Sequence, residues 1–154
     1  MDTKIEPKEK LIFIVDDDAV FVNSCKEFLS KEGFRTGVAY DGVEALKEIA
    51  KTPPNLIILD LLLPKLSGYE VVKKLQEDYL TKSIPVIIVT IKKVDAGTRQ
   101  MFVMEPNVVD FMSKPVNLHI LTLKIHQLLH TIPHDEKILE EYRKKIGVKP
   151  EEKI

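Results

Sequence analysis

The stretch Leu11–Asp18, which reads LIFIVDDD, indicates the fold class and also raises a question of chemistry. Its first five residues are continuously apolar, a pattern typical of a strand that is covered on both faces of a parallel sheet. Three adjacent acids, Asp16, Asp17 and Asp18, follow directly. Like charges side by side repel one another and folding alone does not require them, so their presence points to function.

Four more short apolar runs follow, at residues 35–40, 55–59, 85–90 and 108–112. Between the runs, apolar residues recur at helical spacing, for example at Val22, Cys25 and Leu29 in the first interval and at Leu118, Leu121, Ile125 and Leu128 after the last run. Strand and helix therefore alternate five times within residues 11–130. This alternation predicts an α/β fold with a doubly wound, five-stranded parallel sheet and helices on both faces.

Five polar side chains stand at or just after the predicted carboxyl ends of these strands. Asp16 and Asp17 follow the first strand, Asp60 follows the third, Thr90 ends the fourth and Lys114 follows the fifth. In doubly wound sheets, ligands bind beyond the carboxyl ends of the strands, so these side chains are expected to meet in one crevice. Neighbouring carboxylates raise one another's pKa, and a divalent cation that prefers hard oxygen ligands, such as Mg²⁺, removes that conflict. The pattern therefore predicts a metal site at Asp16 and Asp17 beside Asp60.

The chain resembles the receiver domain of two-component response regulators over about residues 10–130. The matching pieces are VDDD (15–18), DLLLPKLSG (60–68), IIVT (87–90) and DFMSKP (110–115). An acidic pair alone would be a weak signal, but the complete set of motifs is specific. The resemblance implies a flavodoxin-like strand order, 2-1-3-4-5, with a helical extension after the last helix of the sheet.

The resemblance also assigns the chemistry of the acids. Asp60 would be the phosphoacceptor, whose carboxylate attacks the phosphorus of a phosphohistidine on a sensor histidine kinase or phosphotransfer protein, or of a small acyl phosphate. Asp17 would bind Mg²⁺ (or Mn²⁺) directly and Asp16 would bind it through water. Asp60 and the backbone carbonyl of Leu62 would complete the protein's ligands.

Three further motif residues receive roles from the same resemblance. Lys114 would pair with a phosphoryl oxygen, and the Lys114–Pro115 peptide bond would be cis. The hydroxyl of Thr90 would bond another phosphoryl oxygen and, with the aromatic ring of Phe111, form the conformational switch. The face made by the fourth helix, fifth strand and fifth helix would then change shape. A downstream protein partner or an output domain would read that face. The sequence does not give the oligomeric state, but a homodimer, if formed, is expected to use the same face.

Ordinary structural roles exist for the same residues. Asp16 and Asp17 can cap a helix, which is the role expected for Asp18. Thr90 can close a turn at the end of its strand. Phe111 fits plain core packing as well as it fits a switch. The joint occurrence of these residues with Lys114 favours the receiver interpretation for the acids.

Position 62 separates the receiver from the alternative function, a phosphohydrolase that works through an aspartyl phosphate. Such enzymes typically carry a second Asp two residues after the nucleophile, and this chain has Leu62 there. We therefore expect a signalling domain that catalyses at most its own phosphorylation and dephosphorylation. The lifetime of the phosphoryl group does not follow from the sequence, because Ile91, Leu62 and Lys92 are an unusual set around the path of the attacking water.

Composition and isolated reactive residues exclude several other functions. The formal net charge of −1 does not favour direct nucleic-acid binding, and no apolar run is long enough for a membrane span. The single cysteine, Cys25, fits a cytoplasmic protein and is expected to be buried and inert. His119, His126 and His130 lie on roughly one helical face, and we interpret them as solvated rather than metal-binding.

The chain divides into three segments. Residues 1–10 form a polar leader without the features of a signal peptide, residues 11–131 form the predicted receiver domain, and residues 132–154 form a charged helical tail or linker. The tail is too short for a DNA-binding output domain. It is expected to belong either to a stand-alone receiver or to a longer regulator, and the sequence names neither the kinase nor the pathway.

Overall fold

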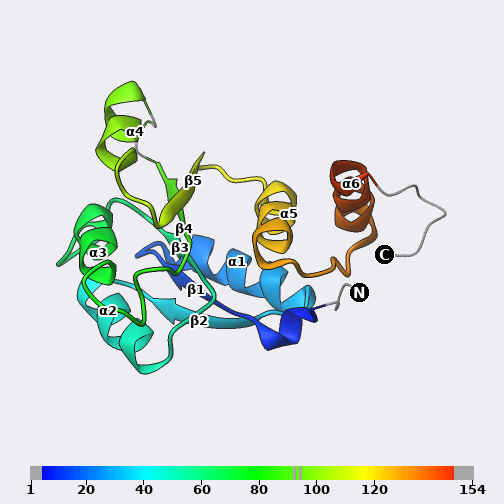
Figure 1. Ribbon diagram of the computed structural model, residues 1–154, viewed down its shortest axis with the longest axis horizontal. Helices are drawn as coiled ribbons and strands as arrows, with labels where there is room; N and C mark the ends of the chain where they lie inside the picture. Colours follow the sequence, from blue (N-terminus) through cyan, green and yellow to red (C-terminus); the bar gives the residue numbers. More distant parts are fainter. Residues whose placement is uncertain (1–4, 92, 94, 148–154) are drawn as a thin grey trace.

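The computed structural model describes residues 5–91, 93 and 95–147, and it contains a five-stranded sheet in which all neighbouring strands are parallel (Figure 1). The strands are β1 (Leu11–Val15), β2 (Arg35–Ala39), β3 (Leu56–Leu59), β4 (Val86–Thr90) and β5 (Val108–Ser113). Their order is β2-β1-β3-β4-β5. The predicted fold class and strand order are therefore confirmed.

Six α-helices connect and extend the sheet. They are α1 (Ala19–Lys31), α2 (Gly42–Lys51), α3 (Gly68–Leu75), α4 (Ala96–Phe102), α5 (Leu118–Leu129) and α6 (Glu136–Ile146), and a short 3-10 turn spans Pro7–Glu9. Each of these α-helices begins after an Asp, Ser or Asn whose side chain accepts backbone N–H groups that the helix itself cannot satisfy. The cap predicted at Asp18 is confirmed, because its carboxylate accepts the N–H groups of Val20 and Phe21.

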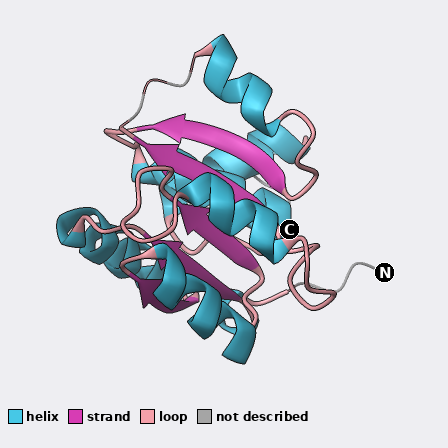
Figure 2. Cartoon of the chain, turned by 90° about the vertical axis from the view of Figure 1, so that its left-hand side faces the viewer, coloured by secondary structure: helices cyan, strands magenta, loops and turns pink. Residues whose placement is uncertain are grey.

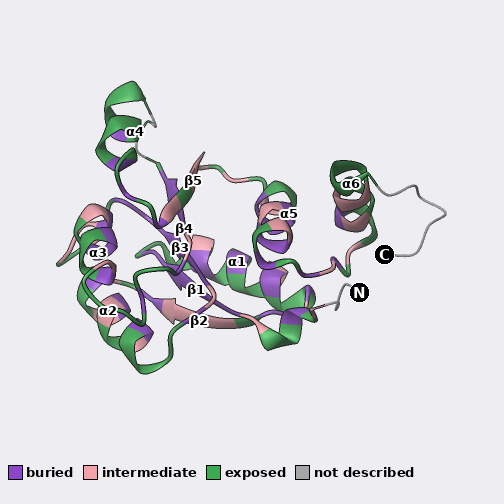
Figure 3. Cartoon of the chain, in the orientation of Figure 1, coloured by how far each residue is buried: buried purple, intermediate pink, exposed green. Residues whose placement is uncertain are grey.

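Helices cover both faces of the sheet (Figure 2). Phe13 and Val15 of β1 pack toward the side of α2, α3 and α4, whereas Ile12 and Ile14 pack toward α1 and α5. Every residue of β1, β3 and β4 is therefore buried, as the continuous apolar runs predict (Figure 3). The edge strands β2 and β5 are only partly buried, which is why their apolar runs are less continuous.

The tail is docked on the rest of the molecule through the carboxylate of Glu32, which ends α1. Glu32 accepts the backbone N–H groups of His134 (3.1 Å) and Asp135 (2.8 Å), just before α6 begins. Its Oε1 also lies 2.8 Å from Nε2 of His126, whose Nδ1 lies 2.7 Å from the hydroxyl of Thr131. Burial favours the neutral carboxyl, but these hydrogen bonds outweigh it and hold the pKa of Glu32 below its usual range.

The buried His126 corrects one sequence interpretation. His119 and His130 are exposed as expected, but His126 is fully buried, so the prediction of a solvated histidine there is wrong. The buried side of α5 includes His126 and Leu129, whereas Leu128, placed on the predicted apolar stripe, is 38% exposed. The apolar residues alone do not predict the buried face of α5 correctly, because His126 is polar. It is buried because Glu32 and Thr131 satisfy its two ring nitrogens.

The described part of the leader and the segment that precedes α6 meet near this network. Ile5, in the described part of the leader, forms a parallel bridge with Thr131, and α6 packs against α5 and buries Ile138 (Figure 1). The predicted helical tail is present as α6, which ends at Gly147 in the left-handed conformation. The rest of the predicted tail or linker, residues 148–154, lies outside the described residues. None of the described helices is long and apolar enough to cross a membrane.

Candidate functional site

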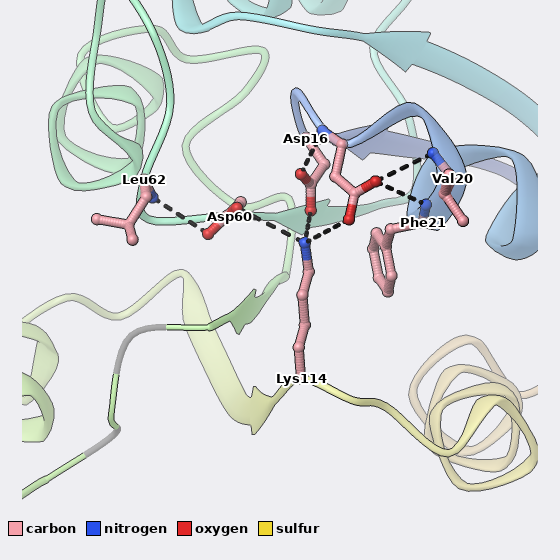
Figure 4. A network of polar contacts seen from close by, with 7 residues as sticks. Asp16, Val20, Phe21, Asp60, Leu62 and Lys114 are labelled. Carbon is pink, nitrogen blue, oxygen red and sulfur yellow. Dashed lines mark hydrogen bonds and ion pairs between the residues drawn. The ribbon is translucent and has the colours of Figure 1, made fainter.

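The candidate site lies where the carboxyl ends of four adjacent strands meet. Asp16 directly follows β1, Asp60 directly follows β3, Thr90 is the last residue of β4, and Lys114 directly follows β5. Because these strands are neighbours in one parallel sheet, the predicted residues emerge at the same edge. Figure 4 shows Asp16, Asp60 and Lys114 pointing toward one another.

Three carboxylates form the acidic part of the site. Asp16, Asp17 and Asp60 each offer an oxygen atom, and these atoms lie within 4.8 Å of one another. Asp16 and Asp60 are almost fully buried, whereas Asp17 is exposed. Burial, reinforced by the charge of Asp60, raises the pKa of Asp16, although the Lys114 ammonium and the N–H of Asp18 act in the opposite direction. Such a cluster of hard oxygen atoms, open on one side, fits a divalent cation that retains several water ligands.

Lys114 supplies the positive charge of the site. Its Nζ lies 2.6 Å from Oδ2 of Asp16, 3.8 Å from Oδ2 of Asp60 and 3.9 Å from Oδ2 of Asp18. Burial alone would lower the pKa of this ammonium, but its pairing with Asp16 and the charges of Asp60 and Asp18 raise it. The Lys114–Pro115 peptide bond is cis, the geometry that the family resemblance implies.

The loop after β3 fixes the carboxylate of Asp60. The N–H of Leu62 donates to Oδ1 of Asp60 at 3.1 Å, so the other oxygen faces Lys114. Gly68 approaches this loop so closely that a Cβ atom there would lie 2.4 Å from the carbonyl oxygen of Asp60 and 2.8 Å from Cα of Leu61. This contact gives a physical reason for glycine eight residues after Asp60.

The two predicted switch residues, Thr90 and Phe111, belong to the neighbouring strands β4 and β5. Thr90 is completely buried, and Phe111 in β5 is half-buried. The Phe111 ring meets that of Phe102 edge-on with centroids 5.5 Å apart, and the guanidinium of Arg99 lies 5.4 Å from its centroid. Phe111 is therefore packed against α4. Core packing and switching both remain compatible with this position.

Of the three residues expected around the path of the attacking water, two are described. Ile91 and Leu62 are exposed, with 71% and 48% of their surface accessible, and Lys92 lies outside the described residues. Sequence reasoning missed Phe21, whose ring centroid lies 4.4 Å from the Lys114 ammonium. No sequence signal distinguishes this phenylalanine from an ordinary apolar position in the first turn of α1.

Comparisons with known proteins agree with the geometry. Residues 12–126 match the family model of the response regulator receiver domain. The response regulator MprA of Mycobacterium avium is 32% identical over 126 residues, which make up 81% of this chain and 54% of that protein. The chain therefore spans about half the length of this curated relative.

Solved structures show the same architecture. A two-component response regulator from Clostridium difficile is 26% identical, with a TM-score of 0.71 over 79% of this chain and 96% of that one. A CheY-like response regulator receiver domain protein from Methanospirillum hungatei is 28% identical, with a TM-score of 0.68 over 88% of this chain and 98% of that one.

Proposed function

The chain belongs to the response regulator receiver domain family of two-component systems, and we propose that it accepts a phosphoryl group on the carboxylate of Asp60. The observation that carries this proposal is the convergence of Asp60 with two other acids and one lysine at the sheet edge. The donor is a sensor histidine kinase or phosphotransfer protein, which would present a phosphohistidine.

Asp60 acts as the nucleophile in this proposal. One of its carboxylate oxygens forms a bond to phosphorus while the P–N bond of the phosphohistidine breaks, and the imidazole nitrogen keeps the electron pair. The N–H of Leu62 restrains the orientation of the Asp60 carboxylate. Lys114, 3.8 Å from Oδ2 of Asp60, is within reach of the oxygens of a group attached there. Most of the catalysis comes from positioning and charge stabilisation.

A divalent cation, Mg²⁺ (or Mn²⁺), is the proposed cofactor. Asp16, Asp17, Asp60 and the backbone carbonyl of Leu62 would hold it, directly or through water. When bound, it would neutralise the acids and the charge that develops on the transferring phosphoryl group. The raised pKa of Asp16 supports this assignment, because burial beside Asp60 makes an uncompensated carboxylate unfavourable there.

Signalling would proceed from Thr90 through Phe111 to the surface of α4, β5 and α5. Movement of the buried Thr90 toward a phosphoryl group would open space behind it, and Phe111 would repack in that space. Because Phe111 contacts Phe102 and Arg99 of α4, its repacking would shift that helix. The phosphoryl group thus biases an element with two arrangements, and a downstream partner, an output domain or a second copy of the chain would bind one of them.

In this proposal the chain is a signalling domain, and the only reactions it catalyses are its own phosphorylation and dephosphorylation. No observation favours the alternative phosphohydrolase, since the position two residues after Asp60 carries the apolar side chain of Leu62. Such an enzyme would need an acid or base there to serve its leaving group.

The test is intact-mass measurement after incubation with acetyl phosphate, with Mg²⁺ and with a chelator. Wild-type protein is expected to gain one phosphoryl group only when Mg²⁺ is present, and Asp60→Asn is expected to gain none. Glu77→Gln, which removes an exposed acid from the turn after α3, is the control and should behave as wild type. If the small donor fails because Ile91 excludes it, a donor protein carrying phosphohistidine replaces it. Failure with both donors, or transfer to Asp60→Asn, would overturn the proposal.

A further inference from the structure

Phe21 lies directly beside the lysine of the site. It belongs to the first turn of α1, where its N–H donates to Oδ1 of the capping Asp18 at 3.3 Å. Its half-buried ring packs against the core cluster between the sheet and α1 and α5. The ammonium of Lys114 lies 4.4 Å from the ring centroid, and Figure 4 shows the ring beside Lys114.

This ring limits where the lysine can go. Lys114 has a flexible four-carbon stem, and three carboxylates of different exposure lie within 4 Å of its ammonium. Asp18 is half-exposed and would draw the ammonium toward solvent, whereas Asp16 and Asp60 are buried. With Phe21 on one side, the lysine side chain is only 10% exposed and stays beside the two buried acids.

A shallow hollow borders the site beside Phe21 and Lys114. It has a volume of about 480 Å³, and its lining includes Phe21, Lys114, Asp18 and Ile91. A smaller side chain at position 21 would widen this hollow beside the lysine and admit more water around the ammonium. The face of an aromatic ring attracts a cation electrostatically, most strongly where the cation has lost water, so the ring both excludes solvent and holds the charge.

We propose that Phe21 is a positioning residue that holds the Lys114 ammonium beside Asp60 through a cation–π contact and so speeds phosphorylation. This inference rests on the proposed function, because it assumes that Lys114 stabilises the group transferred to Asp60. Phe21 itself touches neither the donor nor the acceptor. It acts by keeping Lys114 in the arrangement that the transition state needs.

The test separates the electrostatic contact from simple packing. Phenylalanine analogues with one, two or three ring fluorines are incorporated at position 21, which weakens the negative face of the ring with little change in its size. The maximal rate of phosphorylation by a saturating donor is expected to fall with each fluorine. Phe21→Leu should lower that rate roughly tenfold, a value between those expected for an exposed and for a fully desolvated cation–π contact. Phe21→Tyr, which keeps a π face, should restore most of it.

Two further readouts test how specific the effect is. Mg²⁺ affinity and the donor concentration at half-maximal rate should stay near the wild-type values, because the ring of Phe21 is not expected to contact the proposed metal ligands or the donor. Phe28, two turns further along α1, is the control, since its ring contacts His119 with centroids 4.9 Å apart and not the site. The same fluorinated series at position 28 should leave the rate unchanged.

The possible results are distinguishable. A rate that does not respond to fluorination at position 21, while Asp60→Asn still abolishes transfer, would overturn the role of Phe21 and leave the proposed function intact. Equal effects at positions 21 and 28 would also overturn it. If wild-type protein accepts no phosphoryl group from either donor class, both the proposed function and this inference fall. If Phe21→Leu proves unstable, the fluorinated series still decides, because it preserves the shape of the ring.

Discussion

Replacing Glu32 by alanine is expected to destabilise the protein by about 4 kcal/mol, because it breaks a buried hydrogen-bonded pair. The side chain of Glu32 is 3% exposed and that of its partner His126 is not exposed at all. Removal leaves Nε2 of His126 and the N–H groups of His134 and Asp135 without this acceptor. For a chain of this length, that loss corresponds to a fall in Tm of roughly 8–16 °C.

The isosteric substitution Glu32→Gln divides the effect between shape and charge. The amide keeps an acceptor oxygen but carries no charge. Because hydrogen bonds to a charged carboxylate are roughly twice as strong as those to a neutral group, we expect this substitution to cost about 2 kcal/mol of stability. The assay is urea unfolding followed by circular dichroism, with amide hydrogen exchange across residues 131–147 as a local readout. Faster exchange there, with less change in β1 and β3, would show that the carboxylate docks the tail.

The pH dependence of this effect has a definite sign. The hydrogen bonds hold the pKa of Glu32 below its ordinary value of 4.5, so the folded state favours the ionised carboxylate. Its contribution to stability is present above pH 4.5 and is lost as the pH falls through the lower folded pKa. The difference in stability between wild type and Glu32→Gln should therefore shrink as the solution is acidified below pH 4.5.

Glu27→Gln is the matched control for this prediction. Glu27 lies on the same helix and pairs with Lys31 at 3.2 Å, but both side chains are more than 70% exposed. An exposed pair of this kind contributes at most about 1 kcal/mol. If Glu32→Ala costs no more than this control, the network does not hold the tail and the reasoning fails.

Three other predictions concern the loop after β3, the thiol and the approach to the site. Gly68→Ala should cost about 2 kcal/mol and slow phosphorylation, because its Cβ would clash with the backbone of Asp60; urea unfolding and intact mass measure the two effects. Cys25 should be inert to a thiol reagent in the folded protein and react after unfolding, because burial raises the pKa of its thiol to about 12. Ile91→Ala should speed phosphorylation by acetyl phosphate, because it removes an exposed branched side chain beside the site, and unchanged kinetics would contradict a gating role for Ile91.

The sheet could be predicted from the sequence because its central strands are buried on both faces. Such strands appear in the sequence as uninterrupted apolar runs. The observed bounds of β1 and β4 differ from those of the predicted runs by at most one residue. Strand order does not follow from periodicity, and it came instead from the family resemblance. The positions of Asp16, Asp60, Thr90 and Lys114 followed from one geometric rule, that parallel strands present their carboxyl ends at the same edge.

The remaining features depend on contacts between residues that are far apart in the sequence. Glu32 and His126 are separated by 94 positions, and neither is marked by local spacing. From the sequence alone, His126 is expected to be exposed, because its buried partner Glu32 is not known. The predicted apolar face of α5 therefore includes Leu128 and leaves out His126. The contact between Phe21 and Lys114 is hidden for the same reason, since Phe21 alone fits the apolar face of α1.

Two buried acids in this protein, Asp16 and Glu32, have pKa values that are shifted in opposite directions. Asp16 and Glu32 are both almost fully buried. Hydrogen bonds overcome burial at Glu32 and lower its pKa, so the folded state favours its charge. At Asp16, burial and the charge of Asp60 prevail over Lys114 and raise the pKa, so the fold opposes the charge that this sequence places there. An acid that its own fold satisfies is explained by stability, whereas the raised pKa of Asp16, together with its convergence with Asp17 and Asp60, is typical of a functional site.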